Sequence, residues 1–560
     1  MKTRTGFIGI IGLALVIGSH AASPPDLKTK PWKGERQTLP GQITAAFYDE
    51  GGEGVAFHDT DAKNNGKPTA TGHDRRIDVV WEQSDTAGLN GWNVWRASQA
   101  SGPFERLNAR PQNHTVHSDF LRSNGATFFY RVSGVSGGTE VSTSAVVSAS
   151  SRAMTDDELL TSVQEATFRY FWHYGHPASG LAREGFGDTD RVTTGGSGFG
   201  VMAILVGAER GFVSRSAAAD RILKVLVFLE DKASRYHGAW AHWLNGQTGQ
   251  TIPFSRFDDG GDLVETSFLV EALLTARQYF DGANSTEREI RRRATKLWEA
   301  VEWDWYLGEP KGEQLFWHWS PNYGWKMNHR IGGHFNECLI TYLLALASPT
   351  HPIPPSCYTN GWIGRDSAKF VNDNSYFGIL QPVGWPMGGP LFFTHYSFLG
   401  FDPRGWRDPH CNYFENNRAI SRIHYAYAVA NPGHHTGYGE SVWGLTACRG
   451  PDGYQAFEPR NDNGTVAPTA ALSSMPYTPR ESMAALKHYY YTLGHRLWGD
   501  FGFKDAFNLD RNWFEPGYLA IDQGPIVVMI ENHRTGLCWR LFMANEEIPR
   551  ALGPSGWAKQ

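Results

Sequence analysis

The densest group of acidic side chains lies in the run FDDGGDLVET, residues 257–266. Two glycines break the chain before Asp262, and the apolar segment that follows has helical spacing. On a helix, Asp262 and Glu265 would share one face, with their Cβ atoms roughly 5–6 Å apart. An N-cap with an acidic first turn explains Asp262, but it does not explain Glu265 among Leu263 and Phe268. We therefore consider catalysis here beside simple helix capping.

A second carboxylate, Glu337, occurs in the run GGHFNECLI, residues 332–340. This run is also a Gly-Gly turn that leads into an apolar helix. Alone, Glu337 would be read as an acidic residue of a first helical turn. Two such sites make a pair, and cleavage of a glycosidic bond needs a pair of carboxylates. One protonates the leaving oxygen, and the other activates water or attacks the anomeric carbon.

Aromatic residues make up 13% of the chain and gather in loops rich in glycine and proline. Aromatic faces stack on the apolar faces of sugar rings, although a large aromatic core would also explain this composition. The adjacent histidines 434 and 435 lack an HExxH-like partner, so we expect neither a metal nor another cofactor. The expected substrate-binding residues are Trp319, Tyr323, Trp325, Trp385, His395, Tyr396, Glu440 and Trp443.

Helical periodicity dominates from residue 151 to residue 560, which we take as the catalytic domain. Capping boxes are expected at Thr155–Glu158 and Thr478–Glu481. Long loops, which are 305–334, 380–411 and 431–477, separate the helices and favour an (α/α) toroid with a cleft at one end. The expected helices are 155–174, 197–210, 215–234, 262–281, 285–304, 335–347, 412–429 and 478–495.

The first 150 residues have a different pattern. Residues 1–21 combine a basic start, an apolar stretch and a small-x-small cleavage site, as in a signal peptide. Residues 22–42 read as a linker. Residues 43–150 alternate with period two and resemble a fibronectin type III-like β-sandwich. Strands are expected at 78–82, 91–97, 127–132 and 139–148.

Bulk composition excludes some classes of partner. The net charge of −5 gives no basic excess for nucleic acid, and no segment after residue 21 is apolar enough to span a membrane. We expect an exported, monomeric protein that is periplasmic or secreted. The five cysteines are scattered, allow at most two disulfides and have no metal-binding spacing.

Six long stretches resemble the endo-β-1,2-glucanases of glycoside hydrolase family 144 and the related glucoamylase-like domain of cyclic β-1,2-glucan synthases. The matching stretches are FDDGGDLVETSFLVEALL (257–274), HFNECLITYLLALASPTH (334–351), GGPLFFTHYSFLGFDPRG (388–405), GYGESVWGLTACRGPDGY (437–454), DNGTVAPTAALSSMPYTP (462–479) and YLAIDQGPIVVMIENHRTGL (518–537). The similar region covers about residues 155–550, so the β-sandwich lies outside it.

This resemblance implies a mainly α protein with an (α/α)6 toroid in a Gram-negative bacterium. It implies hydrolysis of linear β-1,2-glucan with inversion, to sophorose and short sophoro-oligosaccharides. The important acids of the family fall on Asp258, Asp262, Glu265 and Glu337. Our mechanistic hypothesis makes Glu337 the general acid, Asp262 or Glu265 the base, and Asp258 a ligand of substrate or water. The acid and the base could be exchanged.

Three other functions stay open from the sequence. An exo-acting enzyme would release sophorose from a chain end, and the loops 351–375 and 403–420 are candidates for blocking the cleft. A polysaccharide lyase would need a basic cleft, for which the net charge gives no support. A non-catalytic glucan-binding protein is disfavoured by the four retained carboxylates.

Overall fold

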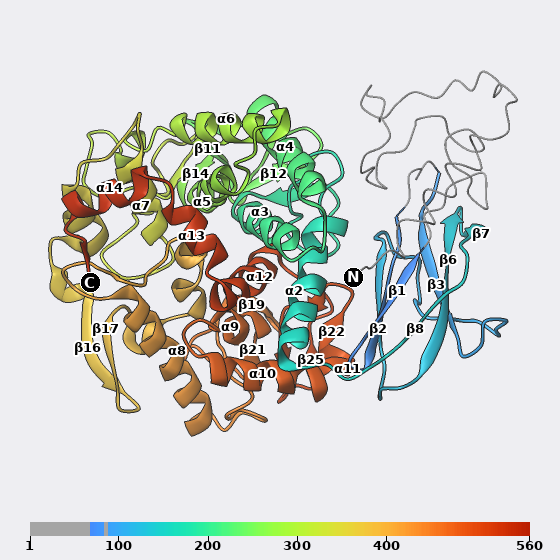
Figure 1. The fold of residues 1–560 in the computed structure, drawn as a ribbon. Helices are drawn as coiled ribbons and strands as arrows, with labels where there is room; N and C mark the ends of the chain where they lie inside the picture. The colour runs from blue at the N-terminus through green and yellow to red at the C-terminus, as the bar shows by residue number, and fades with distance from the viewer. Residues whose placement is uncertain (1–67, 83–87) are drawn as a thin grey trace, which may run out of the picture.

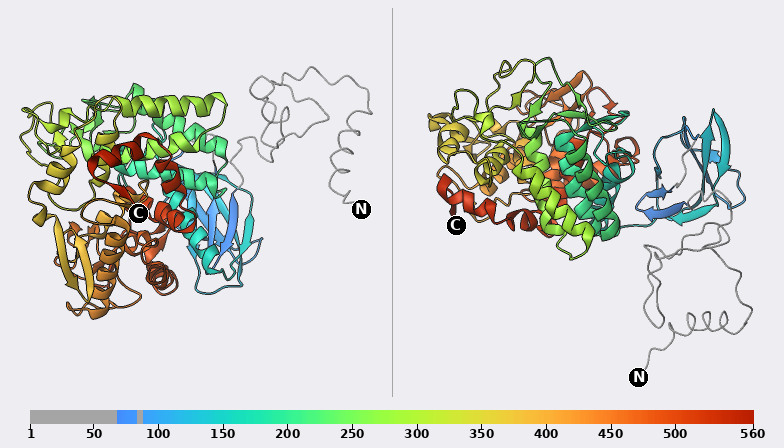
Figure 2. Two further views of the ribbon diagram at one scale, coloured as in Figure 1. Left: turned by 60° about the vertical axis from the view of Figure 1, so that its left-hand side comes forward. Right: turned by 90° about the horizontal axis from the view of Figure 1, so that it is seen from above.

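The structure is a computed structural model that describes residues 68–82 and 88–560. Figures 1 and 2 show a β-rich N-terminal domain beside a larger helical domain. The predicted signal peptide, the linker and the first part of the predicted sandwich lie outside the described residues. The helical domain holds most of the chain and the candidate site.

The β domain consists of two antiparallel sheets around one small core. The first sheet has the order β1-β2-β5, and in the second β4, β3, β6 and β7 follow one another while β8 also pairs with β6. Alternate residues such as Ile77, Val79 and Trp92 fill the core between them. The strands are β1 (Thr69–His73), β2 (Arg76–Val80), β3 (Gly91–Ala97), β4 (Glu105–Arg106), β5 (Val116–Phe120), β6 (Thr127–Ser136), β7 (Thr139–Thr143) and β8 (Val147–Ser150). The single strand expected at 139–148 is therefore divided into β7 and β8.

The helical domain confirms all eight expected helices, with shifts at their ends. These are α2 (Asp156–His173), α3 (Thr194–Glu209), α4 (Arg215–Asp231), α5 (Leu263–Tyr279), α6 (Ser285–Glu299), α7 (Leu339–Ala347), α8 (Tyr413–Ala430) and α10 (Pro479–Tyr491). Five helices were not expected: α9 (Pro468–Ser473), α11 (Gly494–Leu497), α12 (Ala520–Arg534), α13 (Leu537–Met543) and α14 (Glu547–Leu552). Most of these are short, but α12 is a central element.

The two expected capping boxes have different outcomes. At the start of α2, Thr155 accepts a hydrogen bond from the backbone N–H of Glu158, and the Glu158 carboxylate accepts one from Thr155 in return. The box expected at Thr478 is wrong, because this side chain donates to the carbonyl of Ser474 (3.2 Å) instead of capping α10. The preceding turn competes for the threonine hydroxyl.

Helix α12 lies in the centre of the helical domain and packs against α2, α3 and α9. It is buried all round although it contains Gly524 and Pro525. A Cβ at Gly524 would lie 2.3 Å from the Cβ of Phe199, so the glycine allows α3 and α12 to approach closely. Helices α3 and α5 are likewise buried on all sides, whereas α6 buries one face only. The helices therefore form an inner group and an outer group.

All five cysteines are buried and unpaired. The disulfides that an exported chain would permit are therefore not formed. Within residues 68–82 and 88–560, no helix is long and apolar enough to cross a membrane.

Candidate active site

The expected acidic motif forms the first turn of α5. The Asp262 side chain accepts hydrogen bonds from the backbone N–H groups of Val264 (3.0 Å) and Glu265 (2.9 Å), so it caps the helix as predicted. The Glu265 carboxylate accepts a hydrogen bond from the backbone N–H of Gly195 in α3 (2.7 Å). A Cβ at position 195 would lie 2.6 Å from this carboxylate oxygen, so only glycine leaves room for the contact.

Two histidines surround Asp262. Strand β14 (Gly261–Asp262) pairs with β15 (His318–Trp319) in a register that sets Asp262 opposite His318. His318 Nε2 lies 3.1 Å from Asp258 and 3.4 Å from Asp262, and His242 Nδ1 lies 3.3 Å from Asp262. A short hairpin thus brings residues 258, 262 and 318 into one charged network, and this pairing is not readable from helical periodicity.

The charges in this network stabilise one another. Burial disfavours the charged form of His242, but Glu265 and Asp262 outweigh it and raise its pKa to about 10. Burial also opposes protonation of His318, yet Asp258 and Asp262 raise its pKa to about 9. Although burial opposes ionisation of Asp262, the two histidines hold its pKa well below the ordinary range. Asp262 is therefore a carboxylate that two imidazolium groups share.

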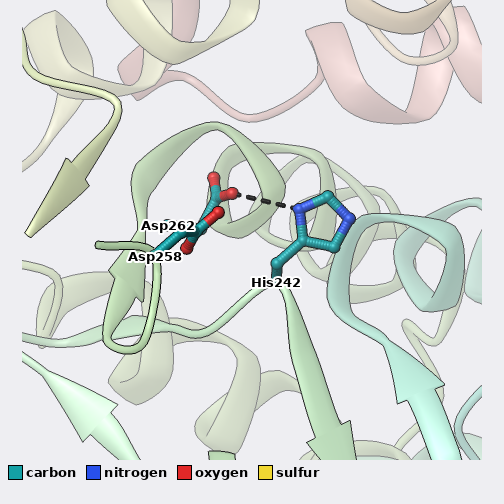
Figure 3. A group of neighbouring side chains, drawn as sticks. All are labelled: His242, Asp258 and Asp262. Atoms are coloured by element: carbon teal, nitrogen blue, oxygen red, sulfur yellow. Dashed lines mark hydrogen bonds and ion pairs between the residues drawn. The ribbon is translucent and has the colours of Figure 1, made fainter. Parts of the chain in front are cut away.

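Three members of the network also lie close enough to hold a cation. Ligand atoms of His242, Asp258 and Asp262 lie within 4.8 Å of one another, and Figure 3 shows the two carboxylates facing the imidazole. However, a protonated His242 that donates to Asp262 offers no lone pair to a metal. The ion pairs alone account for this geometry, which fits a positioning role for the three residues, and the catalytic roles expected of Asp258 and Asp262 stay predictions.

Asp262→Asn is expected to destabilise the fold by about 3–5 kcal/mol, because it leaves two buried imidazolium groups without their shared counter-ion. In the wild type, His242 and His318 have raised pKa values, so their stabilisation is complete below about pH 6.5 and lost as pH rises through about 9 to 10. Denaturant unfolding across this range should show a smaller decline for Asp262→Asn. Asp259→Asn, which alters a more exposed carboxylate in the same motif, is the control.

Glu337 does not lie in a helix but in the turn before α7, because Asn336 accepts a hydrogen bond from the Cys338 backbone (2.9 Å). The helix expected from 335 therefore begins at 339. Glu337 is only 9% exposed, and its Oε2 has no hydrogen-bond partner among the described residues. Burial raises the pKa of Glu337 to about 7, and the charge of Glu265 adds to this shift. Such a carboxyl can hold a proton near neutral pH.

A cavity of about 390 Å³ contains Glu265 and Glu337 in its lining. Burial, together with the charge of Asp262, raises the pKa of Glu265 to about 7 despite the opposing effect of His242. Aromatic side chains surround the two acids, as expected for a sugar site. The other lining residues are Glu184, Arg191, His242, Trp243, Phe254, Phe268, Trp317, Phe392, Tyr396, Ala447, Arg449, Tyr454, Leu519 and Ile521.

The Tyr396 hydroxyl group is affected by the charges of several carboxyl groups. Burial raises its pKa well above the ordinary value, and the charges of Asp522, Glu337 and Glu265 contribute. Asp522 lies in the first turn of α12, directly after the lining residue Ile521. Acids from α5, α12 and the turn before α7 thus all act electrostatically on one phenol.

Asp522 belongs to a second pair of acids that the sequence did not reveal. It is 2% exposed and interacts electrostatically with Asp505, which accepts a hydrogen bond from the backbone N–H of Arg449 (2.8 Å). Burial raises the pKa of both carboxyls, and the charge of Asp505 raises that of Asp522 further. Two adjacent buried carboxyls share one proton, which leaves one negative charge on the pair.

The expected substrate-binding residues are only partly in place. Tyr396 lines the cavity. His395 is 2% exposed and hydrogen-bonds to Ser474 (3.0 Å), and Trp443 is fully buried, so both pack in the core and neither lines the cavity. Each lies in a segment that the sequence predicts as a loop, 380–411 for His395 and 431–477 for Trp443. Glu440 is exposed but does not line the cavity.

The other aromatic residues of the predicted set pack outside the cavity lining. Trp319 packs edge-on against His237, Tyr323 against Phe257, Trp325 stacks on Phe316, and Trp385 packs near His334. The loops 351–375 and 403–420, expected to control cleft length, contribute no lining residue either.

The lining residues that the sequence missed include Glu184, Trp243, Phe254 and Tyr454. Phe254 and Tyr454 are about half exposed, at 49% and 54%, so their rings are free to stack on a sugar. Phe254 follows the edge strand Thr251–Ile252 of a three-stranded sheet, and Tyr454 lies on the strand Gly453–Ala456 of a two-stranded hairpin. Helical periodicity gives no signal for such short strands. Exposed aromatics flanked by turn residues were the only available clue.

Several known proteins are similar to this chain in sequence. A family model described as "Putative glucoamylase" matches residues 328–546. A protein of Parabacteroides distasonis named exo beta-1,2-glucooligosaccharide sophorohydrolase (non-reducing end) is 44% identical over 503 residues, which cover 86% of this chain and 69% of that protein.

Two solved structures are similar as well. A β-1,2-glucanase from Parabacteroides distasonis has a TM-score of 0.84 at 41% identity and covers 90% of this chain and 75% of its own. An endo-β-1,2-glucanase from Chitinophaga pinensis, solved with sophorotriose and glucose, has a TM-score of 0.70 at 46% identity and covers 73% of this chain and 99% of its own.

Together with the paired acids, these relatives define the class of protein: it is a glycoside hydrolase. The chain belongs to the glucoamylase-like family of β-1,2-glucanases, the type of glycoside hydrolase family 144. The resemblance identified from the sequence is thereby confirmed.

Proposed function

We propose that this enzyme hydrolyses β-1,2-glucan in the cavity formed around Glu265 and Glu337. The observation that carries the proposal is that two buried carboxyls, each with a pKa of about 7, line one aromatic cavity. The names of the relatives support β-1,2-glucan as the substrate.

In the proposed mechanism, Glu337 is the general acid. Its free Oε2 can donate a proton to the leaving oxygen, and its raised pKa keeps that proton in place near neutral pH. Glu265 is the proposed base, because it lines the same cavity and Gly195 fixes its orientation. Inversion requires carboxyl groups roughly 6.5–9.5 Å apart, with a water molecule between the base and the sugar. Asp522 is the rival base that the structure adds.

The proposed pair predicts a bell-shaped dependence of kcat/KM on pH. Activity should fall above about pH 7 as Glu337 loses its proton and below about pH 7 as Glu265 gains one. The apparent pKa values belong to the pair, since each acid affects the other. In Glu265→Gln the residual activity should lose its acid limb, and the alkaline limb should move to lower pH because the charge that raises the pKa of Glu337 is gone. Unchanged limbs in this variant would contradict the pairing.

Endo action is the mode proposed from the catalytic domain, which matches the Chitinophaga endo-enzyme over 73% of the chain. One observation favours a second mode, release of sophorose from the non-reducing end. The matches to Parabacteroides distasonis proteins cover 86% and 90% of the chain, so they extend into the β domain. One of these relatives is named an exo-enzyme.

A substrate panel tests the proposed function. The purified protein should release reducing ends from linear β-1,2-glucan and not from β-1,3-, β-1,4- or α-1,4-glucans. The α-1,4-glucan arm matters because the matching family model carries the name glucoamylase. Cleavage of starch with no action on β-1,2-glucan would overturn the substrate assignment.

We also propose that the helices close into the expected (α/α)6 toroid. Contacts of α3 with both α5 and α12, and of α5 with α7, support an inner ring. Export to the periplasm or medium and a monomeric state stay proposals based on the sequence. Cell fractionation and size-exclusion chromatography with light scattering test them.

A further inference from the structure

The β domain is joined to the helical domain by buried charges. Arg76, which has no exposed surface, donates to Asp78 (2.7 Å), to Ser162 of α2 (2.6 Å) and to Tyr490 of α10 (3.2 Å). Arg169 of α2 also donates to Asp78 (2.5 Å). Separating the two domains would remove partners from these buried charged groups, which is energetically costly. These contacts therefore hold the two domains in one orientation. Figure 1 shows α2 and β22 (Trp498–Gly499) facing this sheet.

A second contact lies at His114, just before β5. His114 Nε2 lies 2.8 Å from Asp500, and its ring packs against Tyr174, Phe186 and Phe501 at centroid distances of 6.3, 5.8 and 5.0 Å. The His114 side chain is only 4% exposed. The β domain therefore touches Phe186, which belongs to the segment Arg183–Arg191, here called the wall loop.

The wall loop connects His114 to the cavity. Phe186 donates its backbone N–H to the carbonyl of Tyr518 (3.0 Å), and the carbonyl of Glu184 accepts from Ala520 (3.0 Å) at the start of α12. Gly187 donates to the hydroxyl of Tyr174 (2.8 Å), whose ring also contacts His114. A displacement of Phe186 would thus be transmitted to Glu184, two residues away.

The wall loop presents two charged groups to the cavity. Glu184 and Arg191 both line it, and Glu184 Oε2 is buried without a hydrogen-bond partner among the described residues. Arg191 lies 4.5 Å above the ring of Trp243, another lining residue, and pairs with Asp188 at 2.8 Å. An unpaired buried carboxylate oxygen in a sugar site is suited to accept hydrogen bonds from sugar hydroxyls.

We propose that the β domain supports the active-site wall from behind, with His114 ordering the wall loop so that Glu184 binds hydroxyl groups of the glucan. His114 and Phe186 are positioning residues, and Glu184 contacts the substrate. The glucan as ligand rests on the proposed function, whereas the ordering of the wall loop by His114 does not.

Hydrogen exchange tests the ordering directly, without any need for activity. In His114→Ala, the backbone amides of residues 185–187 should exchange at least about tenfold faster than in the wild type, because the ring that covers Phe186 is gone. His117→Ala is the matched control. His117, which lies on β5, is 3.6 Å from the same Asp500, but its ring is not among those that pack on Phe186. Unchanged exchange in a folded His114→Ala protein would overturn the proposal.

Phe186→Ala is the second variant for the hydrogen-exchange test if His114→Ala does not fold. The Phe186 ring is 36% exposed, so its removal is tolerated better and breaks the same contact from the loop side. The same faster exchange is expected, and unchanged exchange would again overturn the proposal.

A double-variant cycle tests the link to substrate. His114→Ala and Glu184→Gln should each lower kcat/KM for a β-1,2-gluco-oligosaccharide by roughly ten- to a hundredfold. The double variant should be no worse than Glu184→Gln alone, because both changes remove one interaction. Multiplied losses, or a lower unfolding midpoint with unchanged kinetics, would overturn the role of His114. A wild type inactive on β-1,2-glucan would instead refute the proposed function, and the exchange result would still stand.

Discussion

Replacing Glu337 by glutamine is expected to lower kcat on β-1,2-glucan by roughly 10²- to 10⁴-fold while the protein stays folded. Glutamine has the same shape but cannot donate the proton that the leaving oxygen needs. Because Glu337 Oε2 has no hydrogen-bond partner within residues 68–82 and 88–560, the substitution breaks no bond to them at that atom. Initial rates of reducing-end release, with circular dichroism of both proteins, measure the effect.

Two controls make this test specific for a general acid. The first control is Glu271→Gln. Glu271 is a fully buried glutamate of α5 that accepts a hydrogen bond from the backbone N–H of Gly400 (2.8 Å) and does not line the cavity. This substitution should leave kcat within about twofold of the wild-type value. A nitrophenyl sophoroside needs little protonation of its leaving group, so Glu337→Gln should retain far more activity on it. A Glu337→Gln enzyme with most of its polymer activity would exclude Glu337 as the acid.

Loss of the base is expected to have a comparable effect. Glu265→Gln should lower kcat by roughly 10²- to 10⁴-fold, because water would no longer be activated beside the anomeric carbon. Added azide should restore part of the rate and yield a glycosyl azide of inverted configuration, since azide needs no base. Product analysis by NMR identifies this compound.

Asp522→Asn separates the two candidate bases. Burial and the neighbouring charge of Asp505 raise the pKa of Asp522, and its Oδ2 has no hydrogen-bond partner among the described residues, so when ionised it too could accept a proton from water. If azide restores Asp522→Asn and not Glu265→Gln, the base is Asp522 and Glu265 is a positioning residue. The reverse result confirms Glu265.

The sequence predicted the acids on α5 and before α7 because a local signal marks them. A glycine pair followed by a carboxylate and an apolar run places Asp262 and Glu265 at a helix start, and the structure has this arrangement. The same pattern at Glu337 predicted an acid next to an apolar helix but began that helix too early, since Asn336 holds the segment in a turn.

The rest of the site depends on contacts between distant segments. Asp505 and Asp522 meet across the chain, and neither has a local motif. Helix α12 was missed because Gly524 and Pro525 resemble a break, although tight packing against α3 keeps the helix intact. Trp443 lies in a segment that looks like a loop, and burial in the core cannot be read from such a segment.

Digestion of linear β-1,2-glucan, with early products separated by size, tests the central claim most directly. We predict that the wild type produces a spread of sophoro-oligosaccharides, or sophorose alone if the enzyme acts from the non-reducing end, and that Glu337→Gln leaves the polymer intact. An intact polymer with the wild type, or equal cleavage by Glu337→Gln, would contradict the proposal that these acids hydrolyse β-1,2-glucan in this cavity.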